Sequence, residues 1–248
     1  LGVTIGMKAG LFNVGVAGQM LTAGFLATVL VGYSGLDAYI SKPLVVLVGI
    51  AAGGLLGALV GLLKYKFNIH EVVSSIMFNY IVSFVTGFFI NTYYADSITR
   101  TSKVVSAASR LTITDIRAGN LKLTLPLGIL IAFLAVFFVR FLLDRTVLGF
   151  ELKTIGKNSK CAKYAGVNVG RNIVIAMALS GVFAGLVGVT YYLGYYNTII
   201  PRTLADLGYD SIAVSMLGNV NPVGSIFASI LITIFQKGSV YMSSSTGV

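Results

Sequence analysis

Long apolar stretches separated by short polar segments run through most of the chain. A transmembrane helix needs about 20 mostly apolar residues to cross about 30 Å of hydrocarbon, and a helix satisfies its own backbone groups in lipid. Five stretches meet this requirement: residues 14–33, 44–63, 72–90, 123–143 and 173–192. The pattern therefore predicts an all-α fold, a polytopic transmembrane helix bundle that forms one domain over residues 1–248.

A sixth apolar region, residues 207–241, is interrupted by the polar stretch GNVNP at 218–222. Proline removes a backbone donor, and Asn and Gly favour turns, so we expect two helical pieces there, 207–217 and 223–241. A similar interruption lies at residues 10–18. Irregular backbone at membrane depth persists only where it is buried in protein or lines a cavity. We therefore expect broken or re-entrant helices at both places.

Composition narrows the class of protein. Hydrophobic residues make up 56% of the chain, charged residues only 10%, and the mean hydropathy is +0.89, which excludes a disordered chain. The formal net charge is +10, but the basic residues lie between apolar blocks, which argues against a nucleic-acid partner. A single Cys and a single His exclude a disulfide framework and an ordinary zinc site. A modest bias of Lys and Arg places residues 144–172 in the cytoplasm and 91–122 outside.

Glycines recur at a helical spacing in two of the predicted spans. The second span repeats glycine every four residues and the fifth span repeats the spacing once, at Gly49, Gly53, Gly57, Gly61, Gly181 and Gly185. Such a face lets another helix approach closely. A static packing interface is the favoured interpretation, with a moving interface as the alternative, because faces of small residues are common in membrane bundles.

Chemistry for energy coupling is missing from the five spans. They hold no Asp or Glu at mid-depth, where a proton-coupled transporter is expected to carry a buried carboxylate or His. No filter signature, complete phosphate loop or hydrolase motif is present. We expect no enzyme activity, metal or cofactor, and instead a passive pore, a structural subunit or the channel half of a machine driven by another chain.

Uncharged polar residues stand out in the apolar surroundings. Six of them are candidates for a solute path: Asn13, Gln19, Asn79, Tyr80, Asn219 and Asn221. Interhelical hydrogen bonding is the alternative role for each. A cluster of tyrosines lies at the outer end of the fifth span: Tyr191, Tyr192, Tyr195 and Tyr196. It predicts an interfacial aromatic belt, with stacking on a planar solute as the alternative.

The segment 144–172 is too long and too patterned for a minimal connector. Residues 158–164 are expected to form a short helix, with Asn158 or Ser159 as its N-cap and Gly166 ending it in a left-handed conformation. Two roles remain open for this helix. It could dock into a groove of a partner protein, or it could lie on anionic lipid through its lysines.

Three motifs carry a resemblance to a known family. The segment 144–172 contains Gly149-x-Glu151-(x)4-Gly156-x-Asn158-(x)3-Ala162-(x)2-Ala165-Gly166-Val167. It resembles the coupling-helix loop of ABC-importer permeases in the ribose/branched-chain amino acid superfamily. The stretches GLFNVGVAGQ at 10–19 and EVVSSIMFNY at 71–80 are similar to motifs of its nucleoside-type branch. One departure is Ala17, where many relatives carry Glu, so a role of that Glu does not carry over.

The resemblance implies a permease subunit that forms the translocation path for nucleosides in the bacterial cytoplasmic membrane. It implies a second permease subunit, homologous or identical, and an extracellular solute-binding lipoprotein. It also implies a cytoplasmic ABC ATPase, which alone holds ATP and Mg²⁺. That ATPase would grip the coupling loop at Gly149, Glu151, Gly156, Asn158, Ala162, Tyr164, Ala165 and Gly166.

Other interpretations stay open at this point. The solute could be a sugar or another small polar molecule, or the protein could be a passive facilitator or scaffold. Family permeases have about ten spans by resemblance, so we expect the chain to be a fragment that lacks spans at each end.

Overall fold

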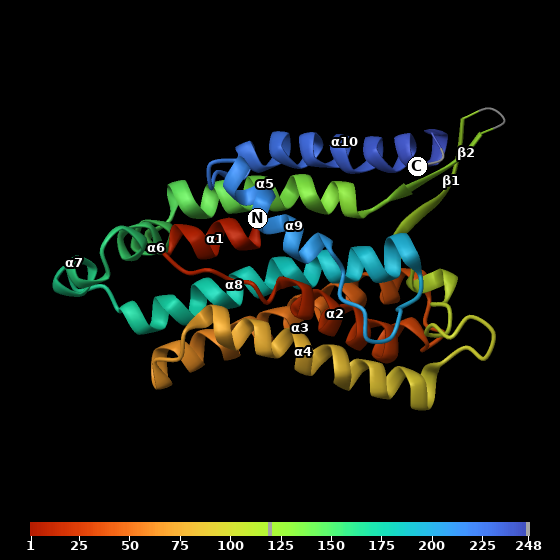
Figure 1. Ribbon diagram of the computed structural model, residues 1–248, viewed down its shortest axis with the longest axis horizontal. Helices are drawn as coiled ribbons and strands as arrows, with labels where there is room; N and C mark the ends of the chain where they lie inside the picture. Colours follow the sequence, from red (N-terminus) through yellow and green to blue (C-terminus); the bar gives the residue numbers. More distant parts are fainter. Residues whose placement is uncertain (119–120, 247–248) are drawn as a thin grey trace.

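A computed structural model describes residues 1–118 and 121–246. Its elements, in chain order, are α1 (Gly2–Lys8), α2 (Val16–Ala27), η1 (Thr28–Gly32), α3 (Ala38–Phe67), α4 (Glu71–Phe89), η2 (Ile90–Tyr94), η3 (Ala107–Ser109), β1 (Thr112–Ala118), β2 (Leu121–Pro126), α5 (Gly128–Arg145), α6 (Val147–Lys157), α7 (Ser159–Tyr164), α8 (Val169–Thr190), η4 (Tyr191–Tyr196), α9 (Leu207–Leu217) and α10 (Pro222–Thr246). Figure 1 shows an elongated bundle with α7 at one end and the β1–β2 hairpin at the other. We call these the α7 end and the hairpin end.

Most of the predicted spans are confirmed as helices. Four helical stretches are long and apolar enough to cross a membrane: Ala38–Phe67, Glu71–Tyr94, Val169–Tyr196 and Pro222–Ser245. The first predicted span is the shorter apolar stretch Val16–Gly32, and the broken sixth region is α9 followed by α10. The all-α prediction therefore holds for the bundle as a whole.

The predicted span at 123–143 is wrong in its first part. Leu121–Pro126 is strand β2, which pairs antiparallel with β1 from Thr112↔Pro126 to Ala118↔Leu121, and helix α5 begins only at Gly128. The sequence LKLTLP alternates apolar and polar residues with a period of two, which favours a strand over a helix. Residues 119–120, which belong to the predicted outer loop, and residues 247–248 lie outside the described residues.

The glycine faces meet at the centre of the bundle, where α3 and α8 form its most extensive helix pair. A Cβ added at Gly53 would overlap the carbonyl oxygen of Gly181, and a Cβ added at Gly185 would overlap that of Gly49. The two backbones are therefore in direct contact, with no side chain between them. The predicted close approach of these glycine faces is confirmed.

The break at residues 10–18 forms a re-entrant turn. Gly2 begins α1 beside Ser180, in the middle of α8, and Gly10 lies against Gly156 at the α7 end. The non-helical residues 9–15 then return to the middle of the bundle, where α2 begins (Figure 1). Gly10 has a φ of 72°, a left-handed conformation that glycine adopts without strain. The first turn of α2 therefore lies inside the protein rather than at either end.

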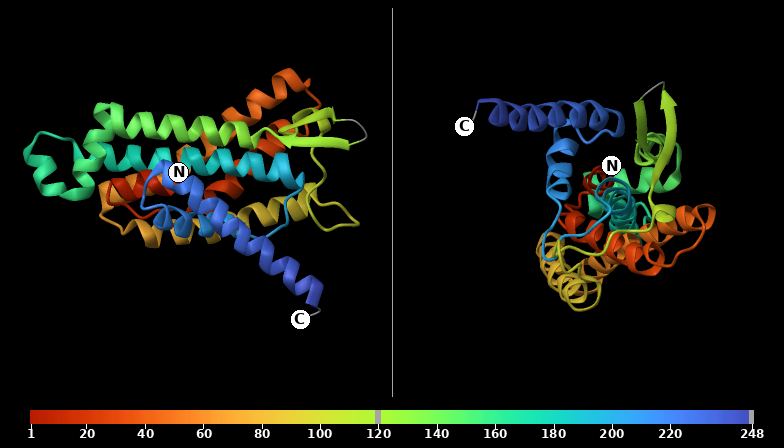
Figure 2. Two further views of the ribbon diagram at one scale, coloured as in Figure 1. Left: turned by 90° about the horizontal axis from the view of Figure 1, so that it is seen from above. Right: turned by 90° about the vertical axis from the view of Figure 1, so that its right-hand side faces the viewer.

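The second break lies at the α7 end rather than at mid-depth. Residues 218–221 separate α9 from α10, and Pro222 is the first residue of α10. Proline is tolerated at this position because the N–H of the first helical residue has no hydrogen-bond partner within the helix. Asn221 borders a cavity together with Lys8, Arg140 and Asp144. Helix α10 packs mainly on α9 and α5 and then diverges from the bundle (Figure 2), so most of its side chains are exposed.

Candidate functional site

Three buried amide side chains gather around the first turn of α2. The Asn13 amide donates to Gln19 Oε1 at 3.0 Å and to Ser180 Oγ at 2.8 Å, and its own oxygen accepts the Gly15 N–H at 2.9 Å. Asn13, Gln19 and Asn79 are all nearly inaccessible to solvent. We call Asn13, Gln19, Asn79 and Ser180 the polar cluster. The hydrogen bonds of Asn13 satisfy an amide that would otherwise be costly to bury.

Asn79 of α4 caps α2 from a neighbouring helix. The N-cap residue of α2 is Gly15, which has no side chain to bond the free N–H groups of the first turn. Asn79 Oδ1 accepts the Gly18 N–H at 2.8 Å, and Asn79 Nδ2 donates to the Val14 carbonyl at 3.0 Å and to the Tyr209 hydroxyl at 3.4 Å. Asn79 thus joins α2, α4 and α9 where the re-entrant turn ends.

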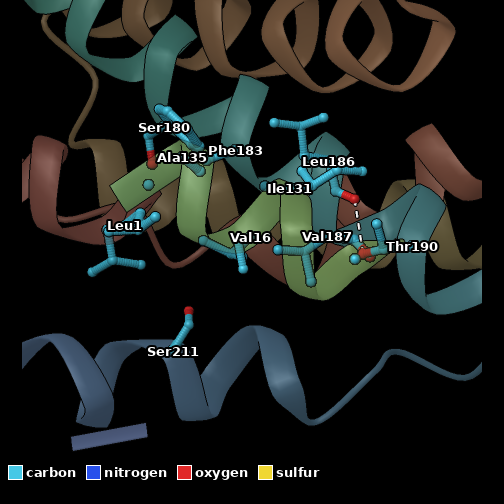
Figure 3. A pocket seen from close by; sticks show the side chains of 15 residues that line it. Leu1, Val16, Ile131, Ala135, Ser180, Phe183, Leu186, Val187, Thr190 and Ser211 are labelled. Atoms are coloured by element: carbon cyan, nitrogen blue, oxygen red, sulfur yellow. Dashed lines mark hydrogen bonds between the residues drawn. The ribbon is translucent and has the colours of Figure 1, made fainter. Parts of the chain in front are cut away.

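A cavity of about 180 Å³ adjoins the polar cluster (Figure 3). It lies between α1, α5, α8 and α9, and its walls are mostly apolar. Three hydroxyls border it: Ser180 and Thr190 of α8, and Ser211 of α9. The Thr190 hydroxyl donates to the carbonyls of its own helix, and Val16, at the start of α2, also borders the cavity. Within the described residues, the Gln19 Nε2 amide is buried without a hydrogen-bond partner. We call the cavity between α1, α5, α8 and α9 the central cavity.

The other predicted path residues lie elsewhere. Tyr80 follows Asn79 on α4, but its side chain is exposed on the outside of the bundle. Asn219 and Asn221 lie in the turn at the α7 end, where the Asn221 side chain accepts the Val223 N–H at 3.0 Å. Sequence reasoning missed Ser180, Tyr209 and Ser211. Ser180 could have been identified from the sequence, because it is a lone hydroxyl at the centre of an apolar span.

Both short helices of segment 144–172 have side-chain caps. Thr146 Oγ1 accepts the Gly149 N–H at 3.1 Å and begins α6, while Asn158 Oδ1 accepts the N–H groups of Lys160 and Cys161 and begins α7. Gly166 follows α7 with a φ of 83°. The predicted short helix, its Asn158 cap and its left-handed end at Gly166 are confirmed.

Helix α6 is held firmly against the bundle. A Cβ at Gly149 would overlap the Leu142 carbonyl of α5, and one at Gly156 would overlap the Lys8 carbonyl at the end of α1. Glu151 Oε2 accepts a hydrogen bond of 2.8 Å from the Asn172 amide of α8. These contacts join α6 to α1, α5 and α8.

Helix α7 projects from the bundle and is fixed by Ala162, which is fully buried. Its remaining surface is open: Tyr164 is 93% exposed, and Cys161 is a free, exposed thiol. The lysines of this region, Lys157, Lys160 and Lys163, are exposed as well. Helix α7 therefore presents one aromatic side chain in a basic surrounding, and Ala165 and Gly166 next to it are also exposed.

Glu71 ties the re-entrant turn to two helices at the α7 end. It forms an ion pair with Lys64 of α3, begins α4, and accepts the Phe12 N–H at 3.5 Å. Within residues 1–118 and 121–246, no group of three or more His, Cys, Asp or Glu side chains could hold a metal ion. Through its ion pair and hydrogen bond, Glu71 joins the re-entrant turn to α3 and α4.

Comparisons with known proteins agree with this architecture. A family profile described as "Branched-chain amino acid transport system / permease component" matches residues 1–247. The chain is 37% identical to the guanosine ABC transporter permease protein NupP of Bacillus subtilis, over 100% of this chain and 71% of that protein. It is 32% identical to the nucleoside ABC transporter permease protein NupB of Lactococcus lactis, over 96% of this chain and 68% of that protein.

A more distant relative is named for a different solute. The chain is 23% identical to the glucose ABC transporter permease protein TsgB13 of Haloferax volcanii, over 100% of this chain and 67% of that protein. No solved structure gives a significant match.

Proposed function

Because this chain belongs to the branched-chain amino acid transport permease family, we propose that it forms part of a nucleoside translocation path in an ABC importer. The chain is a multi-pass membrane protein of the cytoplasmic membrane and a transporter subunit rather than an enzyme. The observation that supports nucleosides is the similarity to permeases named for guanosine and nucleosides at 37% and 32% identity. A sugar is the second candidate, because the permease named for glucose is similar at 23%.

The solute path runs through the central cavity. Among its three hydroxyls, those of Ser180 and Ser211 offer hydrogen bonds to a neutral polar solute. The remaining walls are mostly apolar and would not hold the solute tightly. The polar cluster, which includes Ser180, holds the first turn of α2 in place. Asn13 bonds to Ser180 of α8, and Asn79 of α4 bonds to the Gly18 N–H of α2. Discontinuous helices of this kind border substrate sites in membrane transporters.

The motor is a separate ATPase that grips α7 from the cytoplasm. The lysines around α7 support a cytoplasmic position for this end, because cytoplasmic segments carry an excess of Lys and Arg. The ATPase holds ATP and Mg²⁺, a second permease subunit completes the pore, and an extracellular binding lipoprotein supplies the solute. ATP drives transport by binding one state of the assembly more tightly than the other, which is how a ligand shifts a conformational equilibrium.

Uptake of labelled guanosine by cells with and without the gene tests this function. We expect uptake to require the gene and an intact ATP supply, and we expect excess unlabelled uridine or adenosine, but not glucose, to compete. Gene-dependent uptake of glucose with no uptake of any nucleoside would contradict the substrate and would leave the permease assignment standing.

A further inference from the structure

A second cavity lies at the hairpin end and is lined by tyrosines. It has a volume of about 140 Å³ and is bordered by Tyr191, Tyr192 and Tyr196 of η4 and by Asp206 just before α9. We call it the tyrosine pocket. The elements that line it, η4 and the segment before α9, lie at the end of the bundle opposite α7 (Figure 1), which is the extracellular side in the proposed orientation.

The rings of the tyrosine pocket are packed against one another. The centroids of Tyr191 and Tyr196 are 4.8 Å apart, and those of Tyr191 and Tyr192 are 5.0 Å apart at an interplanar angle of 88°. Tyr192 is buried and packs tightly on Gly24 of α2, which holds this wall in place. Tyr196, in contrast, is 51% exposed, so part of its surface is free to receive another ring.

Asp206 supplies the charged group of the pocket. Its side chain is exposed, and within the part of the chain that the structure describes its carboxylate forms no hydrogen bond or ion pair. A carboxylate accepts hydrogen bonds only, and the two hydroxyls of a ribose are donors that match it. The tyrosine pocket thus combines aromatic faces for a planar ring with an acceptor for a sugar.

The size and position of the pocket suit the base of a nucleoside. A cavity of about 150 Å³ accepts a single aromatic ring. The space of about 140 Å³ therefore takes one ring of a base, while the rest of the nucleoside remains near its opening. One face of α8 leads from this pocket to the central cavity, with Ser180, Ala184 and Val187 bordering the cavity and Tyr191 the pocket. These residues follow the spacing of one helix face.

We propose that the tyrosine pocket is the extracellular entry site for the nucleoside, where the base stacks on Tyr191 and Tyr196 and Asp206 accepts the ribose hydroxyls. This inference rests on the proposed function and adds where the solute first binds. Stacking on an aromatic side chain is tolerant of base identity, because every base has a π-face. An entry site of this kind admits purine and pyrimidine nucleosides alike.

The test uses the assembled importer in proteoliposomes and compares two exposed tyrosines at the same end of the bundle. Tyr196→Leu removes a ring of the pocket, whereas Tyr93→Leu removes a ring that is 63% exposed and does not border it. We expect Tyr196→Leu to lower guanosine uptake at saturating binding protein roughly tenfold. Tyr196→Phe, which keeps the ring, and Tyr93→Leu should both transport within about twofold of the unchanged protein.

Binding is measured independently of transport. The chain contains no Trp, so Tyr196→Trp and Tyr93→Trp each add one fluorophore to it. Guanosine and guanine should quench the signal added at position 196 and not that at 93, and ribose should quench neither. Adding Asp206→Leu should weaken quenching by guanosine and leave quenching by guanine unchanged.

Equal effects of Tyr196→Leu and Tyr93→Leu, with no quenching at position 196, would show that the tyrosines are only an aromatic belt at the membrane interface. In that case guanosine uptake by the unchanged importer would still support the proposed function. If the unchanged importer carries no nucleoside, the proposed function and this entry site fail together.

Discussion

Gly181→Ala is expected to destabilise the bundle by about 3 kcal/mol, at the upper end of the cost of overpacking a core. The new Cβ would overlap the Gly53 carbonyl oxygen of α3, and it would also approach Gly57 Cα at 3.0 Å. These are backbone atoms, so no side-chain rotation relieves the overlap. The two central helices must separate along the whole glycine face, and the packing of α8 against its neighbours weakens with them.

Thermal unfolding of the purified protein in lipid or detergent measures this effect. A loss of about 3 kcal/mol lowers the midpoint by roughly 6–12 °C for a chain of this size. Gly238→Ala is the matched control, because Gly238 lies in α10 and a Cβ there has nothing within 4 Å. That control should be neutral or slightly stabilising, since alanine favours a helix over glycine. An unchanged midpoint for Gly181→Ala would contradict the direct backbone contact between α3 and α8.

Tyr164→Ala is expected to weaken the contact between the permease and its ATPase, and so to lower both transport and the ATP hydrolysis that the solute stimulates. Tyr164 is the most prominent side chain of α7, at 93% exposure, and exposed aromatic residues that fill a partner's pocket often dominate the binding energy. Losing such an anchor costs about 2–4 kcal/mol, or roughly 30- to 1,000-fold in affinity. Because Ala162 rather than Tyr164 fixes α7 to the bundle, the protein itself should fold normally.

Guanosine uptake and guanosine-stimulated ATP hydrolysis in proteoliposomes report this loss of contact. We expect both to fall more than about tenfold for Tyr164→Ala, with thermal stability unchanged. The control is Tyr39→Ala, because Tyr39 is 95% exposed at the start of α3, which lies at the hairpin end. Its removal should change neither activity. Full transport by Tyr164→Ala would exclude Tyr164 as an anchor for the ATPase.

The features that the sequence predicts well are those with a strong local signal. The four-residue spacing of Gly49, Gly53 and Gly57 predicts a close helix contact, because spacing fixes which residues share a face. The Asn158 cap and the left-handed Gly166 are equally local, since each depends on a few neighbouring backbone groups.

The features that it misses depend on tertiary packing. Asn79 and Tyr80 are adjacent polar residues in an apolar span, yet Asn79 is buried beneath α2 and Tyr80 faces outwards. In a membrane helix both faces are apolar, so hydropathy does not tell the buried side from the lipid side. The β1–β2 hairpin was missed because the leucines of LKLTLP lead directly into the apolar stretch of α5, so that the strand and the helix together have the length of one membrane span.

The location of α7 is the premise of the whole account, because a motor in the cytoplasm can drive the bundle only through a segment on that side. Cys161 provides a direct measurement, since it is the one cysteine of this sequence and lies exposed on α7. A membrane-impermeant maleimide should label the protein in inside-out vesicles and not in intact cells, and Cys161→Ser should abolish that labelling. Labelling of Cys161 from outside intact cells would place α7 on the wrong side of the membrane and contradict the account.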